Sequence, residues 1–347
     1  MRTAFAIFGV MLTFSNQAFS ATPILVVNVD DQQVLYSEDA GRAWYPASTT
    51  KLMTAFVTFE AIRAGRVSMD TTVTLSANAM SQKFLNADLS AGRSMRLEDA
   101  LSAVIAGSAN EVSVALAETV AGSEKSFVKS MNDAAHRLGM TGSNFQNPNG
   151  LFDRRQKTTA RDMALLGIAV AKQFPEHRRF FEASAVVIDG KAVDSHNELL
   201  TRFPGTRGLK TGFLCAAGNN VVALAERNAK QVLVVVMGAT TERERNERAA
   251  MYLDRAFTGD LRSNKKALTG IKNDTKRKPV DMRAKLCSAQ TPKYVKARVA
   301  MYPMGLPGQR SFLTNSRPAS VHQIQTWMTE EDPSNRGPKM SEDHPDQ

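Results

Sequence analysis

The stretch Pro46-Ala47-Ser48-Thr49-Thr50-Lys51-Leu52-Met53-Thr54 places a serine and a lysine three residues apart, where an extended segment gives way to a helix. The apolar spacing over residues 50–64 predicts that helix. A serine in the first helical turn lies beside free backbone N–H groups, which favour developing negative charge. Lys51 can reach the Ser48 hydroxyl from the same helix face. Because an amine withdrawn from water loses its proton more readily, Lys51 can serve as the base for Ser48.

This spacing is not decisive alone, because it recurs at Ser126 with Lys129 and at Ser263 with Lys266. The alternative is a capping serine followed by an exposed lysine. The assignment of Ser48 therefore needs support from the rest of the chain.

The first 20 residues have the composition of a secretory signal. Arg2 is followed by an apolar run over residues 4–14 and by small residues at 18–20. The run is too short to span a bilayer, so we expect an exported mature chain beginning near Ala21. Retention of the segment as an uncleaved anchor is the alternative. The expected location is the periplasm or the cell envelope.

The remainder of the 347-residue chain is long enough for one large core and an accessory region. Two cysteines, Cys215 and Cys287, are too few for a disulfide scaffold. In an oxidising compartment they could form one bridge, which would attach the basic C-terminal segment to the preceding domain.

Predicted strands and helices give an α+β pattern, with strands at both ends of the domain and helices inserted between them. The predicted strands are 24–30, 34–36, 185–188, 220–224 and 231–237, and the main helical stretches are 97–139, 159–174 and 241–257. We expect a catalytic domain over residues 21–260 with a helical subdomain at about 75–165. A basic extension over 261–328 and a disordered tail over 329–347 would follow.

The positive charge of the chain is concentrated near its end. The segment from Arg262 to Arg298 contains twelve Lys or Arg and two Asp, and the formal net charge of the whole chain is +10. Such a segment is attracted to anionic lipid or wall surfaces, and an exported protein would rarely meet nucleic acid. We expect an anionic membrane or wall surface as a partner and no nucleic acid. The alternative is a solvated linker.

Two further short motifs follow the serine–lysine pair. Ser108-Ala109-Asn110 lies between two predicted helices, and Lys210-Thr211-Gly212 lies on a predicted strand. Each has an ordinary alternative, because Ser-x-Asn is a common helix cap and lysine is common on edge strands. Their order is informative, since serine-x-x-lysine, serine-x-asparagine and lysine-threonine-glycine follow one another in penicillin-binding proteins and serine β-lactamases.

The similarity extends well beyond these motifs. Over residues 23–257 the sequence resembles the D-alanyl-D-alanine carboxypeptidases, which are low-molecular-mass penicillin-binding serine peptidases. The segments that carry the resemblance are PASTTKLMTA, AGSANEVSVALAE, MNDAAHRLGM, NPNGLFD, TTARDMALL, SHNELLTRFPGTRGLKTGF and VVVMGATTERERNERA. The resemblance implies a β-lactamase/DD-peptidase-like fold, an antiparallel sheet flanked by helices with an inserted helical subdomain. The C-terminal region lacks the strand-rich pattern of the family's usual second domain.

The resemblance also implies a role for each catalytic residue. Ser48 would attack the carbonyl between two terminal D-alanines of a peptidoglycan stem peptide and form an acyl-enzyme. Lys51, held neutral by burial and by the charge of Lys210, would accept the serine proton. Ser108 would relay a proton to the leaving amine, and Asn110 would contact Lys51 and the substrate backbone. β-Lactam antibiotics would be covalent inhibitors of the same serine.

Substrate recognition is implied for residues of the Lys-Thr-Gly strand. Lys210 and Thr211 would bind the terminal carboxylate, and Gly212 would leave room for an extended peptide. The backbone N–H of Phe213, with that of the serine, would stabilise the oxyanion. Arg245 would help to hold the carboxylate, although a solvated helix charge explains it equally well.

Three other functions stay open at this point. A serine β-lactamase would need a group that activates water, and Asp153 and Asp162 are the only carboxylates in the loop 147–162. A peptidoglycan DD-endopeptidase would use the same chemistry on a crosslink. A non-catalytic wall-binding protein would not need the intact motifs. The histidines lack the spacing of metal ligands, so we expect no metal and no other cofactor.

Overall fold

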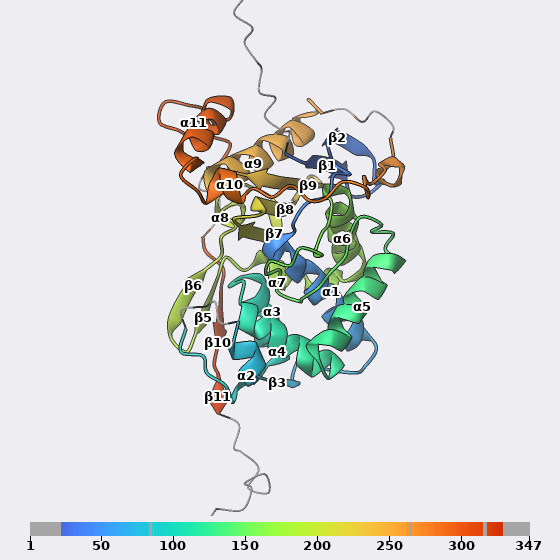
Figure 1. Ribbon diagram of the computed structural model, residues 1–347, viewed down its shortest axis with the longest axis vertical. Helices are drawn as coiled ribbons and strands as arrows, with labels where there is room; N and C mark the ends of the chain where they lie inside the picture. Colours follow the sequence, from blue (N-terminus) through green and yellow to red (C-terminus); the bar gives the residue numbers. More distant parts are fainter. Residues whose placement is uncertain are drawn as a thin grey trace, which may run out of the picture.

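A five-stranded antiparallel sheet forms the centre of the upper half of the molecule in Figure 1. The computed structural model describes residues 22–82, 85, 87–261, 263, 266–314 and 318–328. The expected signal at 1–20 and the expected tail at 329–347 lie outside the described residues. The strand order is β2-β1-β9-β8-β7. The strands are β1 Ile24–Asn28, β2 Val34–Glu38, β7 Thr206–Leu214, β8 Gly218–Arg227 and β9 Lys230–Ala239.

The central strands are apolar because both faces of the sheet are covered. In β9, Leu233 and Val235 belong to the larger core cluster, whereas Val232 and Val234 belong to the smaller one. The helix α9 (Glu242–Thr258) covers the side of the smaller cluster, and α6 (Ala160–Gln173) and α1 (Lys51–Arg63) pack on the other side. This arrangement explains why the valine run of β9 is continuous rather than alternating.

The helical part lies below the sheet in Figure 1 and contains most of the segments between α1 and α6. Its elements are β3 (Thr72–Thr74), α2 (Ala77–Met80), β4 (Arg93–Arg96), α3 (Leu97–Ile105), α4 (Asn110–Ala121) and α5 (Glu124–Arg137). The sheet with its flanking helices and this helical part confirm the α+β class that the sequence predicts.

Shorter elements join these two parts. The hairpin of β5 (Ala185–Ile188) and β6 (Lys191–Asp194) lies between them, preceded by α7 (Arg179–Glu182) and followed by α8 (Leu199–Arg202). Three 3-10 turns occupy Ala47–Thr50, Pro175–His177 and Leu268–Gly270.

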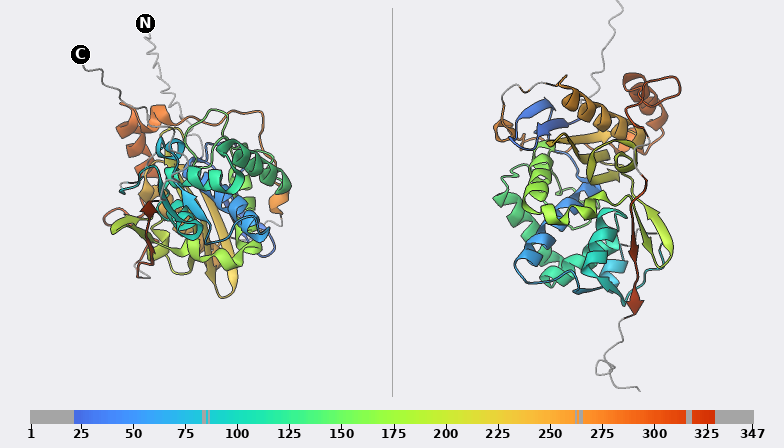
Figure 2. Two further views of the ribbon diagram at one scale, coloured as in Figure 1. Left: turned by 90° about the horizontal axis from the view of Figure 1, so that it is seen from below. Right: turned by 180° about the vertical axis from the view of Figure 1, so that it is seen from behind.

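The C-terminal segment wraps back over the domain rather than forming a second one. It contains α10 (Arg283–Leu286), α11 (Thr291–Met301), β10 (Val321–Ile324) and β11 (Trp327–Met328). The strand β10 pairs in parallel with β5, and β11 pairs antiparallel with β4. Figure 2 shows this strap beside the β5–β6 hairpin. The sequence did not predict these two strands.

One disulfide and one buried arginine attach this segment to the sheet. Cys215 and Cys287 are bonded, with Cα atoms 5.7 Å apart, which confirms the hypothesised bridge. Arg298 is 1% exposed and pairs with the equally buried Glu244. This residue, counted above in the basic segment, is therefore part of the core and cannot meet an external surface. Among the described residues, no helix is long and apolar enough to cross a membrane.

Candidate active site

Ser48 lies in the 3-10 turn that opens α1, and two glycines allow other backbone segments to approach this turn closely. A Cβ on Gly150 would lie 2.0 Å from the Ala47 carbonyl oxygen, and one on Gly212 would lie 2.6 Å from the Ser48 nitrogen. Neither contact is possible for a larger residue without a shift of the backbone. The turn is also fixed to β8, because the Asn220 amide donates hydrogen bonds to the carbonyls of Tyr45 and Pro46.

Lys51 lies directly behind Ser48 and is fully buried. Its Nζ is 3.1 Å from Ser48 Oγ and 2.7 Å from both the side-chain oxygen of Asn110 and the backbone carbonyl of Asn149. Burial, and then the charge of Lys210, hold the pKa of Lys51 well below its ordinary value. A neutral amine has two N–H groups and one lone pair. Two carbonyl oxygens and one hydroxyl therefore satisfy it completely.

The Ser-x-Asn motif forms the opposite side of the site. Ser108 lies in the turn between α3 and α4 and has a φ of 59°, which is rare outside glycine and is often found at functional sites. Asn110 is the first residue of α4. Lys210 of β7 donates a hydrogen bond to Ser108 Oγ over 3.1 Å. The structure thus brings all three motifs together.

Two buried cations lie on the β7 side of the site. Burial, together with the charge of Arg245, lowers the pKa of Lys210 to about 7. Arg245 is 1% exposed, and its guanidinium donates hydrogen bonds to the Asn246 side chain and the His196 carbonyl. Burial lowers the pKa of Arg245 to about 10. The interpretation of Arg245 as a solvated helix charge is therefore wrong.

A cleft of about 490 Å³ joins these groups. Seven of the nine residues proposed from the sequence line it, while Lys51 and Lys210 are buried behind its wall. The seven are Ser48, Ser108, Asn110, Thr211, Gly212, Phe213 and Arg245. The Phe213 side chain is 50% exposed, which leaves its ring at the rim.

Several residues of the site were not singled out as functional from the sequence, among them Asn149, His196 and Asn219. Asn149 accepts a hydrogen bond from Lys51, and His196 and Asn219 line the cleft. Asn149 lies in the segment NPNGLFD and His196 in the segment SHNELLTRFPGTRGLKTGF. Both segments resemble the carboxypeptidase family, and this similarity could have pointed to the two residues. Among the described residues, no group of three His, Cys, Asp or Glu side chains could hold a metal ion.

The sheet, the helical part and the meeting of the three motifs at the edge strand β7 define the class. This is a serine–lysine protein with the fold shared by penicillin-binding proteins and β-lactamases. The chain belongs to the D-alanyl-D-alanine carboxypeptidase family, because the model of that family matches residues 11–241.

Individual relatives agree with this assignment. The chain is 31% identical over 252 residues to the D-alanyl-D-alanine carboxypeptidase DacF of Bacillus subtilis, covering 70% of this chain and 64% of the relative. It therefore spans less than two thirds of that protein. The crystal structure of the D-alanyl-D-alanine carboxypeptidase DacD from Francisella tularensis is also similar, with a TM-score of 0.66 and 25% identity. The match covers 73% of this chain and 74% of that one.

A structure with an antibiotic is also similar. Penicillin-binding protein D2 from Listeria monocytogenes in its ampicillin-bound form has a TM-score of 0.60 and 30% identity. The match covers 68% of this chain and 97% of that one.

Proposed function

We propose that this protein removes the terminal D-alanine from peptidoglycan stem pentapeptides through an acyl-enzyme on Ser48. The observation that carries the proposal is the buried Lys51 amine, whose two carbonyl contacts leave its lone pair for the Ser48 hydroxyl. Family membership supports the choice of a D-alanyl-D-alanine substrate. The same serine would be acylated by β-lactams, as the ampicillin-bound relative suggests.

The first half of the reaction transfers the acyl group to the enzyme. Ser48 Oγ attacks the carbonyl carbon of the penultimate D-alanine while its proton passes to Lys51 Nζ. The oxyanion is stabilised by the backbone N–H groups of Ser48 and Phe213, which the close approach of β7 to the serine turn supports. The C–N bond then breaks.

The leaving amine and the free carboxylate need separate partners. Ser108 Oγ, which accepts a hydrogen bond from Lys210, gives its proton to the departing D-alanine nitrogen. The proton that Lys51 took from Ser48 then replaces it, so Lys51 is again a neutral base for the second step and Lys210 keeps its positive charge. Thr211 and the two cations Lys210 and Arg245 bind the terminal carboxylate. Water then hydrolyses the ester and regenerates Ser48.

A β-lactamase that deacylates with a loop carboxylate is disfavoured. Asp153 is held by Arg155 at 2.9 Å. Asp162 is fully buried and accepts hydrogen bonds from the Gly142 N–H, the Ser143 hydroxyl and the Asn273 amide. Neither carboxylate is available to activate water beside Ser48. The DD-endopeptidase stays the alternative, because its chemistry is the same.

The Ser48→Ala variant tests the proposal. D-Alanine release from a muramyl pentapeptide should fall by roughly a thousandfold or more, and covalent labelling by fluorescent penicillin should disappear. Circular dichroism should be unchanged. Labelling that persists in the variant would exclude Ser48 as the nucleophile. Cleavage of a crosslinked dimer faster than the pentapeptide would favour the endopeptidase.

We further propose that the protein is exported and contacts an anionic envelope surface through its basic segment. The exposed side chains of Lys272, Lys293 and Lys296 support such a contact. The protein should sediment with anionic but not neutral vesicles at low salt and be released as salt rises. Binding that survives high salt would exclude an electrostatic contact.

A further inference from the structure

A second, larger cavity lies outside the catalytic cleft. Its volume is about 840 Å³, and it is formed by the loop that follows Gly150 and by the segment that precedes α10. Seven of its lining residues are Lys or Arg, and one is acidic. We call this cavity the basic groove. Its cations are Arg154, Arg155, Lys157, Lys276, Arg277, Lys278 and Arg283.

Three of these cations are already neutralised. Arg155, Arg277 and Arg283 pair with Asp153, Asp274 and Asp281, respectively. The other four form no ion pair with any residue that the structure describes. These four are Arg154, Lys157, Lys276 and Lys278. Cations gathered in a concave site focus their field on a ligand within it, so the basic groove is suited to an anion.

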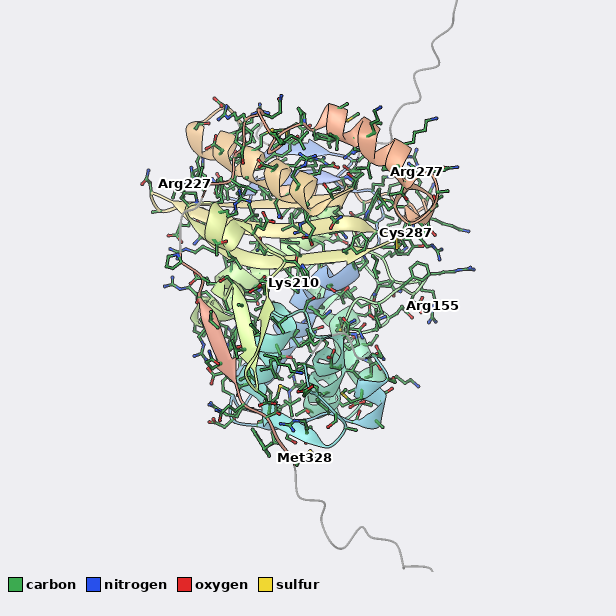
Figure 3. The ribbon with its side chains drawn as sticks, turned by 90° about the vertical axis from the view of Figure 1, so that its left-hand side faces the viewer. Arg155, Lys210, Arg227, Arg277, Cys287 and Met328 are labelled. Atoms are coloured by element: carbon green, nitrogen blue, oxygen red, sulfur yellow. A yellow bond between two sulfur atoms is a disulfide. The ribbon has the colours of Figure 1, made fainter. Side chains whose placement is uncertain are left out.

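The basic groove adjoins one end of the catalytic cleft. Leu151 lines the cleft, and the next residue, Phe152, lines the basic groove. The Arg283 guanidinium lies 4.7 Å from the centre of the Phe152 ring, and Tyr45 contacts the same ring. The disulfide from Cys215, just after β7, to Cys287, just after α10, fixes the two sites together. Figure 3 shows Arg155, Cys287 and Arg277 along one edge, with Lys210 further in.

The cleft has a direction that follows β7. Thr211 begins the part of the strand that lines the cleft, next to the buried Lys210, and Leu214 ends it. A peptide whose C-terminal carboxylate is held at Lys210 therefore passes Ser48 and leaves beside Leu214. The basic groove lies at that exit. This orientation rests on the proposed function.

We propose that the basic groove binds the carboxylates of the stem peptide upstream of its terminal D-alanines. A concave site admits a single chain, whereas a flat bilayer cannot enter it. The volume is that of a ligand pocket rather than of a large interface. The basic groove would thus select stem peptides with free upstream carboxylates over amidated ones, without taking part in the chemistry at Ser48.

The test uses two pentapeptides ending in D-Ala-D-Ala, identical except that the upstream carboxylates are free in one and amidated in the other. The double variant Lys276→Ala/Lys278→Ala removes two unpaired cations that touch no catalytic residue. The control Lys293→Ala/Lys296→Ala removes two exposed lysines of the same segment outside the basic groove. Penicillin acylation monitors the catalytic centre.

The groove variant should lose about five- to tenfold in kcat/KM on the free-carboxylate peptide, as expected for two solvent-accessible charge contacts. Activity on the amidated peptide and penicillin acylation should stay within about twofold, and the control should match the wild type. The preference for the acidic peptide should also decline as salt rises.

Two results would overturn the proposal. One is an equal change on both peptides. The other is an unchanged preference accompanied by loss of binding to anionic vesicles, which would assign these lysines to the envelope surface. Failure of the wild type to release D-alanine from either peptide would instead contradict the proposed function. In that case, equal binding of the two peptides to the Ser48→Ala variant would overturn the groove proposal separately.

Discussion

At the scale of single residues, the site contains two lysines whose charged forms are destabilised by burial. Lys51 is 0% exposed and its pKa is lowered further by the charge of Lys210. Lys210 is 3% exposed and its pKa is lowered further by the charge of Arg245. Water-soluble proteins rarely bury such groups unless function requires it. In the proposed mechanism the lowered pKa of Lys51 allows its amine to act as a base, and protonated Lys210 gains a carboxylate partner when the substrate binds.

The pH dependence of turnover should reflect both lysines. In the free enzyme Lys51 must be neutral and Lys210 protonated, so kcat/KM on a D-Ala-D-Ala peptide should fall as pH rises above about 7, the pKa of Lys210. On the acid side it should fall as Lys51 gains a proton. Steady-state kinetics from pH 5 to 9 measure this profile. In Lys210→Ala the alkaline fall should vanish together with the preference for a free carboxylate. An alkaline limb that persists in this variant would assign it to another group.

Because of Lys210, the free energy of unfolding should rise with pH over the range in which turnover falls. Its pKa is about 7 when folded and 10.5 ordinarily, so the unfolded chain binds more protons between these values. The contribution of Lys210 to the free energy of unfolding therefore rises with pH across that window. The cost of burying its protonated amine is present in full below pH 7, about the pKa of the folded state. Lys210→Met should raise the Tm by a few degrees at pH 6, and less at pH 9, while activity is lost. Thermal denaturation at both pH values measures this. Lys293→Met, at an exposed site, is the control. A lower Tm for Lys210→Met at pH 6 would contradict the expectation.

At the scale of elements, the sequence predicted those whose pattern is strong and local. The valine run of β9, the amphipathic α6 and the long α9 all lie where their periodicity indicates. The strands β10 and β11 were not predicted, because their ladders depend on partners far away in the chain. A short segment with exposed side chains has no periodic signal of its own.

The same distinction applies to the site. The three motifs were recognised because their residue types and order are unusual together. The Asn149 carbonyl is a backbone group, and no side-chain type identifies it. The burial of Arg245 and Arg298 depends on His196 and Glu244, which only the folded chain brings near.

The disulfide joins the end of β7 to the end of α10, and the effect of its loss on stability can be measured. It joins residues 72 apart, so reduction should cost about 4 kcal/mol on the chain-entropy estimate. The Cys215→Ser/Cys287→Ser variant should unfold at lower denaturant. Penicillin acylation should slow because Leu214, the neighbour of Cys215, lines the cleft. Urea unfolding and acylation rates test both effects. Wild-type protein treated with reductant should match the variant. Unchanged stability would show that the packing of α10 suffices.

At the scale of the whole molecule, the C-terminal strap connects the two halves that flank the cleft. Its strand β10 extends the β5–β6 hairpin, and His322 contacts Asp99 of α3 at 2.8 Å. Beyond it, Thr326 and Arg93 both bind Asp189 at the hairpin turn. The strap therefore holds the hairpin against the helical part.

The hairpin that the strap holds lies beside Ser108, the proposed proton donor. Gly107, which precedes Ser108, packs against the hairpin: a Cβ there would lie 3.2 Å from Val186 and 3.6 Å from Val193. Because Ser108 has a positive φ, its turn depends on its neighbours to stay in place. The strap thus supports the position of Ser108 from a distance.

Removal of the strap should consequently weaken catalysis without removing any group that takes part in it. Truncation after residue 317 deletes β10 and β11 and exposes the edge of β5, so we expect faster amide exchange in 185–194 and 93–96. Penicillin acylation should slow by about three- to tenfold, because a slightly misplaced Ser108 transfers its proton less well.

Truncation after residue 328 retains both strands and is the matched control, which should behave as the full chain does. His322→Ala, which breaks only the contact with Asp99, should give a smaller effect in the same direction. Faster exchange in the hairpin with an unchanged acylation rate would show that Ser108 is held by its own turn alone.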